Sequence, residues 1–145
     1  MDKKNATQIT FGGMVFMYGN VQMVADKADE KVILTKLAGP DGLAEEIEKK
    51  DAEVEIFDKL VDAIGNIGCS MIGSEEENTF MATEEEEDTG ACEWYVSVCD
   101  EEENILFCLR GTNPKSNIFK KVCETLEGIC IDFGCVKTFF DEIGE

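Results

Sequence analysis

The alternation of apolar and polar residues predicts a β-hairpin in the second half of the chain. Residues 94–99 and 104–110 alternate in this way, and an acidic turn from Asp100 to Glu103 separates them. Side chains alternate along a strand, so one face of the hairpin collects large apolar residues, and we expect that face to be buried. The predicted cross-strand pairs are Trp94 with Leu109, Val96 with Phe107, and Val98 with Ile105.

A helix is predicted directly after this hairpin. Ser116 or Asn117 can cap its start, and Gly128 can end it. Apolar residues between these signals recur at helical spacing and form one stripe, which is made of Ile118, Val122 and Leu126.

The remaining pattern predicts further strands and a second helix. Asp41 can cap a helix that starts near Leu43, whose later stripe is Ile56, Leu60 and Ile64 and which ends at Gly65. Strands are predicted at 8–17, 21–25, 31–37, 67–72, 79–82, 129–133 and 135–140. We therefore expect residues 1–145 to form a single α+β domain, in which an antiparallel sheet of about nine short strands carries two helices on one face.

The two halves of the chain share a sequence rhythm. Ile33, Leu34, Leu37 and Gly39 match Ile105, Leu106, Leu109 and Gly111 at one constant offset. One interpretation is a duplicated strand-strand-helix-strand-strand unit, spanning 21–83 and 92–141, with residues 41–52 as an insertion that lengthens the first helix. The other interpretation is a chance similarity of hydrophobic rhythm.

Negative charge is concentrated in one third of the chain. The formal net charge is −19, and the fifty residues from Leu60 to Leu109 contain fourteen Asp or Glu and no Lys or Arg. Such a segment repels nucleic acids and anionic membranes and attracts basic protein surfaces. We therefore expect a protein partner with a basic surface, and neither direct nucleic-acid binding nor membrane binding.

Three acidic clusters fall at predicted turns or connections and are the candidate partner-binding residues. Solvated turns also carry charge, but ordinary surfaces mix both signs. Two residues on the outer face of the hairpin, Tyr95 and Leu106, are candidate apolar anchors, although a second small core would also explain them. The clusters are Glu75, Glu76 and Glu77; Glu84, Glu85, Glu86, Glu87 and Asp88; and Asp100, Glu101, Glu102 and Glu103.

The residues needed for common catalytic and metal sites are missing. The chain has no His, which excludes Ser-His-Asp and Cys-His nucleophiles and His metal ligands, and it has no phosphate-binding Gly-rich loop with a following Lys. Its seven Cys include no Cys-x-x-Cys, and most lie in apolar runs. We expect no catalytic residues, no metal and no cofactor, and reduced thiols in a cytoplasmic protein. No run reaches the ~20 apolar residues of a membrane helix.

These features favour an acidic protein-binding module that blocks a basic, nucleic-acid-binding surface of a partner, with a nuclease among the candidates. Phage inhibitors of host defence, anti-CRISPR proteins among them, act in this way, and the analogy rests on charge and size alone. One alternative is a toxin-neutralising immunity protein. Another is a small-ligand binding protein with a pocket between helix and sheet.

Overall fold

The computed structural model describes residues 3–40, 44–69, 75–76, 79–81 and 92–143. Most of the strands come from hairpins in the first half and in the middle of the chain. They are β1 (Ala6–Val15), β2 (Gly19–Ala28), β3 (Lys31–Gly39), β4 (Glu45–Glu53), β5 (Glu75–Glu76), β6 (Thr79–Met81), β7 (Cys92–Asp100) and β8 (Ile105–Gly111). The helices are α1 (Val54–Cys69), α2 (Asn117–Ile129) and α3 (Cys135–Ile143), with short 3-10 turns η1 (Lys3–Asn5) and η2 (Ile131–Gly134).

The described strands form one sheet in the order β4-β3-β2-β1-β7-β8-β6-β5. Neighbouring strands are antiparallel except β6, which pairs in parallel with β8, so the sheet is mixed. The α+β class predicted from the sequence is confirmed, whereas the structure has eight described strands and three α-helices where we expected about nine strands and two helices.

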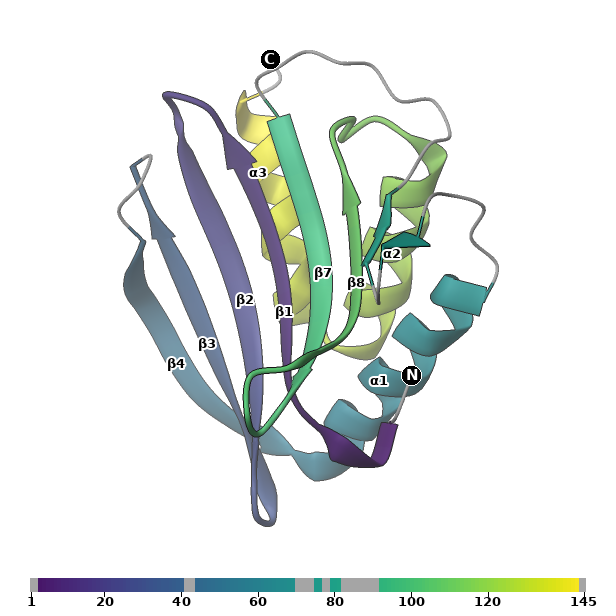
Figure 1. Ribbon diagram of the computed structural model, residues 1–145. Helices are drawn as coiled ribbons and strands as arrows, with labels where there is room; N and C mark the ends of the chain where they lie inside the picture. Colours follow the sequence, from purple (N-terminus) through teal and green to yellow (C-terminus); the bar gives the residue numbers. More distant parts are fainter. Residues whose placement is uncertain (1–2, 41–43, 70–74, 77–78, 82–91, 144–145) are drawn as a thin grey trace.

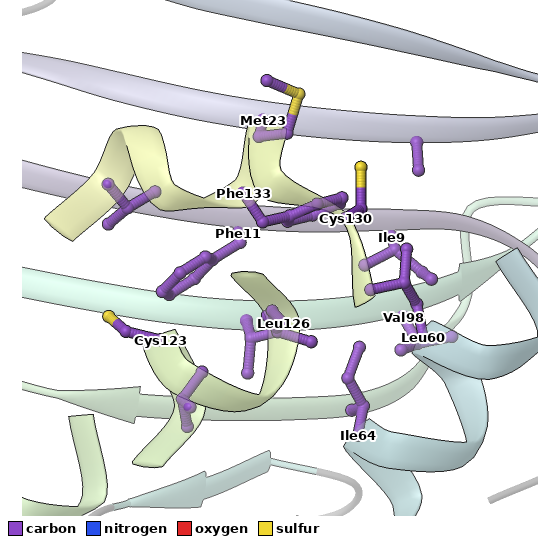
Figure 2. Close-up of a cluster of buried hydrophobic side chains, with 14 of the residues drawn as sticks. Ile9, Phe11, Met23, Leu60, Ile64, Val98, Cys123, Leu126, Cys130 and Phe133 are labelled. Carbon is purple, nitrogen blue, oxygen red and sulfur yellow. The ribbon is translucent and has the colours of Figure 1, made fainter. Parts of the chain in front are cut away.

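The three helices lie on one face of the sheet (Figure 1). Figure 2 shows the core between the two layers, where Ile9 and Phe11 of β1 meet Leu60 and Ile64 of α1 and Leu126 of α2. Residues of this kind stabilise the fold by removing apolar surface from water, at roughly 1.5–3 kcal/mol for each large side chain.

The predicted cap of α2 is confirmed. The Ser116 side chain accepts a hydrogen bond from the Phe119 backbone N–H at 3.1 Å, which satisfies one of the free N–H groups of the first turn. Burial of the stripe then follows the helical period, since Phe119, Val122 and Leu126 are all buried. The helix ends at Ile129, one residue after the predicted Gly128.

The β7–β8 hairpin has the predicted buried face but a different register. Trp94, Val96, Val98, Phe107 and Leu109 are buried, whereas Ile105 is 48 % exposed. Val98 pairs with Phe107, Val96 with Leu109 and Trp94 with Gly111, and a bulge between Val98 and Cys99 places Cys99 opposite Ile105. Our pairing was therefore wrong by two residues, and a shift of two keeps each side chain on its own face.

Strand β4 replaces the first part of the helix predicted from Leu43. Its residues Glu45–Glu53 pair with β3, and all but one are exposed. Lys50 Nζ lies 2.7 Å from Asp132 Oδ1 and ties this edge to η2. A strand at a sheet edge whose side chains are charged resists pairing with other chains. The charges at 45–53 therefore reflect the needs of an edge strand, which the periodicity argument did not consider.

Two other predicted strands are helical. Residues 131–134 form η2 and residues 135–143 form α3, in which Val136 and Phe140 are buried one turn apart. Similarly, α1 continues past Gly65 to Cys69, so the strand predicted at 67–72 is wrong where it is described. In each case packing against the sheet outweighs the β preference of the Val, Ile and Phe residues.

The duplication is not confirmed by the order of elements. A hairpin followed by a helix occurs twice, as β3-β4-α1 and as β7-β8-α2. After α2, however, the chain forms η2 and α3 in place of the expected second hairpin. The matched segments also occupy different places, because β3 corresponds in sequence to β8 but is followed by β4 and not by a helix.

No helix among the described residues is long and apolar enough to cross a membrane.

Candidate protein-binding surface

The β7–β8 turn is held by Asp100. Its carboxylate accepts hydrogen bonds from the backbone N–H groups of Glu102 and Asn104, both at 2.9 Å, and from the Asn104 side chain at 3.1 Å. The Asp100 N–H also donates to the Asn104 carbonyl at 3.0 Å. Bonds of this kind stabilise the charged form, and the Asn104 N–H above all keeps the pKa of Asp100 below its usual value. Asp100 is therefore part of the frame of the turn.

The other three acids of this cluster point into solvent. Glu101, Glu102 and Glu103 are exposed, and within the part of the chain that the structure describes none of them forms an ion pair. Glu103 has a φ of 66°, a left-handed conformation uncommon for a residue other than Gly. The turn thus presents three adjacent carboxylates on a backbone that its own hydrogen bonds fix in place.

Tyr95 lies on the sheet face opposite the described helices, which we call the open face. Its ring covers Gly12 of the neighbouring strand so closely that a Cβ at Gly12 would lie 2.7 Å from the ring. A hydrogen bond joins Tyr95 to the Gln22 side chain, and burial raises the pKa of the Tyr95 hydroxyl. The ring is half-buried, so Tyr95 offers one side of an aromatic surface to a partner.

Polar pairs flank Tyr95 on the open face. Gln8 donates to Asp26 at 2.8 Å, and Arg110 forms an ion pair with Glu93. The hydrogen bond to Glu93 raises the pKa of Arg110, so the guanidinium stays charged. This face is therefore a mixed polar and apolar surface, and the Glu93 carboxylate is already neutralised by its partner.

The other predicted site residues are divided between the core and the sheet edge. Leu106 is half-buried and packs against the core cluster. Glu75 and Glu76 belong to β5 at the outer edge of the sheet. Glu77 and the cluster Glu84, Glu85, Glu86, Glu87 and Asp88 lie outside the described residues.

Sequence reasoning missed an apolar turn between β1 and β2. Phe16, Met17 and Tyr18 are 59 %, 78 % and 73 % exposed. Phe16 and Met17 had been assigned to the end of a strand because they continue its apolar run. The signal that marks them as a turn is the Gly19-Asn20 pair that follows, a common turn sequence.

Two hollows lie on the surface of the described part. A groove of about 340 Å³ between α2 and α3 is lined by Pro114, Lys115, Phe119, Lys120, Cys123, Glu124, Glu127, Lys137 and Asp141. A second, more open hollow of about 420 Å³ is lined by Lys3, Lys4, Lys27, Asp58, Val61 and Asp62. Both have charges of both signs, and the lining of the first comes from the two helices and the loop before α2.

Among the described residues, no group of three or more Cys, Asp or Glu is placed to hold a metal ion. Comparison of the chain with protein-family models, with curated proteins and with solved structures found no match. The function therefore has to be argued from the geometry of these surfaces.

Proposed function

We propose that this protein is an acidic protein-binding module that blocks a basic, nucleic-acid-binding surface on a partner protein. The observation that carries the proposal is the β7–β8 turn, where Glu101, Glu102 and Glu103 are exposed, unpaired and adjacent. Fixed carboxylates attract Lys and Arg without the entropy cost of ordering a flexible segment at the moment of binding. A surface that binds phosphates is basic for the same electrostatic reason.

Charge placement tests this proposal through a matched pair of variants. The first carries Glu101→Gln, Glu102→Gln and Glu103→Gln, which remove three charges at nearly constant shape. The control carries Glu48→Gln, Glu55→Gln and Glu124→Gln, which remove the same charge from exposed positions on β4, α1 and α2. Circular dichroism establishes that both variants keep the fold.

The assay starts with capture of partners from a lysate of the source cell by each immobilised protein. We expect the wild-type chain and the control to retain a basic protein that elutes as salt rises, because exposed charges are screened beyond about 8–10 Å at physiological ionic strength. For that partner, the turn variant should lose roughly tenfold or more in association rate. Duplex DNA should compete with the wild-type chain for it.

Two results would contradict the proposal. Equal losses in the turn variant and the control would mean that total charge matters and the turn does not. An unchanged association rate and salt dependence in the turn variant would leave its carboxylates as a solvated surface. If the captured protein is a secreted or self-encoded toxin, the immunity-protein alternative is favoured over the nuclease inhibitor.

The groove between α2 and α3 is the observation that favours a small-ligand protein. Its place is not the one we expected, since the lining comes from the helices and not from the sheet. Thermal stabilisation by a small molecule, abolished by Lys120→Ala, would support this alternative.

A further inference from the structure

The β1–β2 turn differs from the other described hairpin turns of the sheet in the chemistry of its tip. Three residues other than Gly have positive φ, and they are Met17, Asp29 and Glu103, one in each of three hairpin turns. Two of these turns carry acids at their tips. The third carries Phe16, Met17 and Tyr18, which we call the apolar tip.

Turn geometry does not explain the apolar tip. Met17 has a φ of 69°, a conformation for which Gly or Asn is the common choice and which strains most other residues. Asp29 and Glu103 adopt the same region with polar side chains, so the fold accepts hydrophilic residues at such a position. Three consecutive exposed apolar side chains are also unlike the scattered single ones of ordinary surfaces. Phe, Met and Tyr are enriched at protein interfaces.

The charge around the apolar tip restricts its partner. Glu45 begins β4 opposite Ala38, near the Asn20–Gly39 pair that follows the tip, and Asp141 and Glu142 are exposed in the last turn of α3. Figure 1 shows that α3 ends at the same end of the sheet as the β1–β2 turn. An anionic membrane would repel these carboxylates and the net charge of −19, and so would a second copy of the chain.

We propose that the apolar tip inserts into an apolar pocket on a partner protein, a pocket bordered by Lys or Arg. A tip that protrudes from the end of a sheet fits a concave surface, and its three side chains can be buried there without moving the backbone. The basic border rests on the proposed function above, whereas the apolar pocket rests on the exposure of Phe16, Met17 and Tyr18 alone.

Site-specific photo-crosslinking tests this inference. The full chain carries a benzophenone amino acid at position 17, or at position 131 as a control, since Ile131 is similarly exposed at 77 % on a different surface. After irradiation in a lysate of the source cell, mass spectrometry maps the cross-linked residues. We expect position 17, and not position 131, to link to apolar residues of one protein that lie beside Lys or Arg.

Binding measurements with that protein provide the second arm. Phe16→Ser and Tyr18→Ser should each lower the affinity by about tenfold or more, as truncation of a buried aromatic anchor does, while Ile131→Ser should not. All three variants should keep the wild-type circular dichroism, because each residue is exposed.

Several outcomes would overturn the inference. They are links from position 17 to a second copy of the chain, links to lipid together with sedimentation on phosphatidylcholine vesicles, no protein link from position 17, or an affinity that the tip variants leave unchanged. The proposed function fails separately, when the glutamine variant of the β7–β8 turn keeps its association rate while the tip variants still lose affinity.

Discussion

Two adjacent glycines of β1 provide a test of whether the sheet is covered on one face only. Gly12 lies under Tyr95 on the open face, and Gly13 lies under Phe140 of α3 on the helical face. Neither has a positive φ, so alanine can adopt the backbone conformation of both. Replacing each in turn by alanine adds one methyl group to opposite faces of the same strand.

The Gly13→Ala variant should lose stability. Its Cβ would lie 2.5 Å from Cε2 of the Phe140 ring and 3.3 Å from Val136 Cγ1. Phe140 is 7 % exposed and its ring packs against those of Phe119 and Phe139, at 5.4 and 5.3 Å between centroids. Overpacking of such a site costs about 1–3 kcal/mol, and the lower entropy of the unfolded alanine chain offsets roughly 0.4–1 kcal/mol. We therefore expect a net loss of about 1–2 kcal/mol.

The Gly12→Ala variant should be nearly neutral. Its Cβ would come equally close to the Tyr95 ring, at 2.7 Å, but that ring is half-buried and can turn toward solvent. The loss is then the hydrogen bond to Gln22, about 0.5–1.5 kcal/mol, against the same gain from the unfolded state. The net change should stay below about 1 kcal/mol.

Urea unfolding followed by circular dichroism measures both changes, and thermal unfolding should lower the Tm by roughly 3–6 °C for Gly13→Ala and by less for Gly12→Ala. Tyr95→Ala in the Gly12→Ala background is the control, because it removes the only clash that we invoke. Equal destabilisation by the two glycine variants would refute the reasoning, since Tyr95 would then be held as firmly as Phe140.

Three further predictions follow from individual side chains. Asp100→Asn should destabilise the β7–β8 turn near neutral pH; because the folded pKa of Asp100 lies below its unfolded value, this contribution is present above the unfolded pKa, and the difference from wild type in urea unfolding should shrink as pH falls through the folded value. Trp94→Phe should cost less than its volume suggests, because the buried Trp94 Nε1 has no hydrogen-bond partner and leaving it so costs about 1–3 kcal/mol, which the same urea titration can measure. Cys123 and Cys135 should resist iodoacetamide at pH 8 in the folded protein and react in guanidinium, by intact mass, since burial raises their pKa values to about 12 and about 11.

The sequence predicted the faces of the central hairpin well and its register poorly. Trp94, Val96 and Val98 were assigned to the buried face because a period of two fixes the face of every residue in a strand. The pairing depends on the turn, where the Asp100 hydrogen bonds and the bulge at Cys99 add length that no periodicity reveals. Ile105, the residue nearest the bulge, is the one whose burial was predicted wrongly.

The errors elsewhere share a physical origin. Strand β4 shows no apolar alternation, because it is paired on one side and charged on the other, and only its β3 partner reveals it as a strand. Helix α3 is rich in residues that favour strands, but Val136 and Phe140 at helical spacing pack on Gly13. Of the candidate site, the exposed glutamates could be predicted, whereas Asp100 as a frame residue and the apolar tip required the geometry.

The positions of the two proposed contacts limit the size of the partner. The acidic turn lies beside the start of β1, where Ala6 pairs with Asp100, and the apolar tip follows its end at Val15. The ten residues of β1, at ~3.3 Å each, separate the two by about 30 Å. An interface of standard size buries ~800 Å² on each partner, and a round patch of that area is about 32 Å across. One partner of ordinary footprint can therefore reach both ends of the sheet if it lies along the open face, and Tyr95, between them, would then be covered by the same contact.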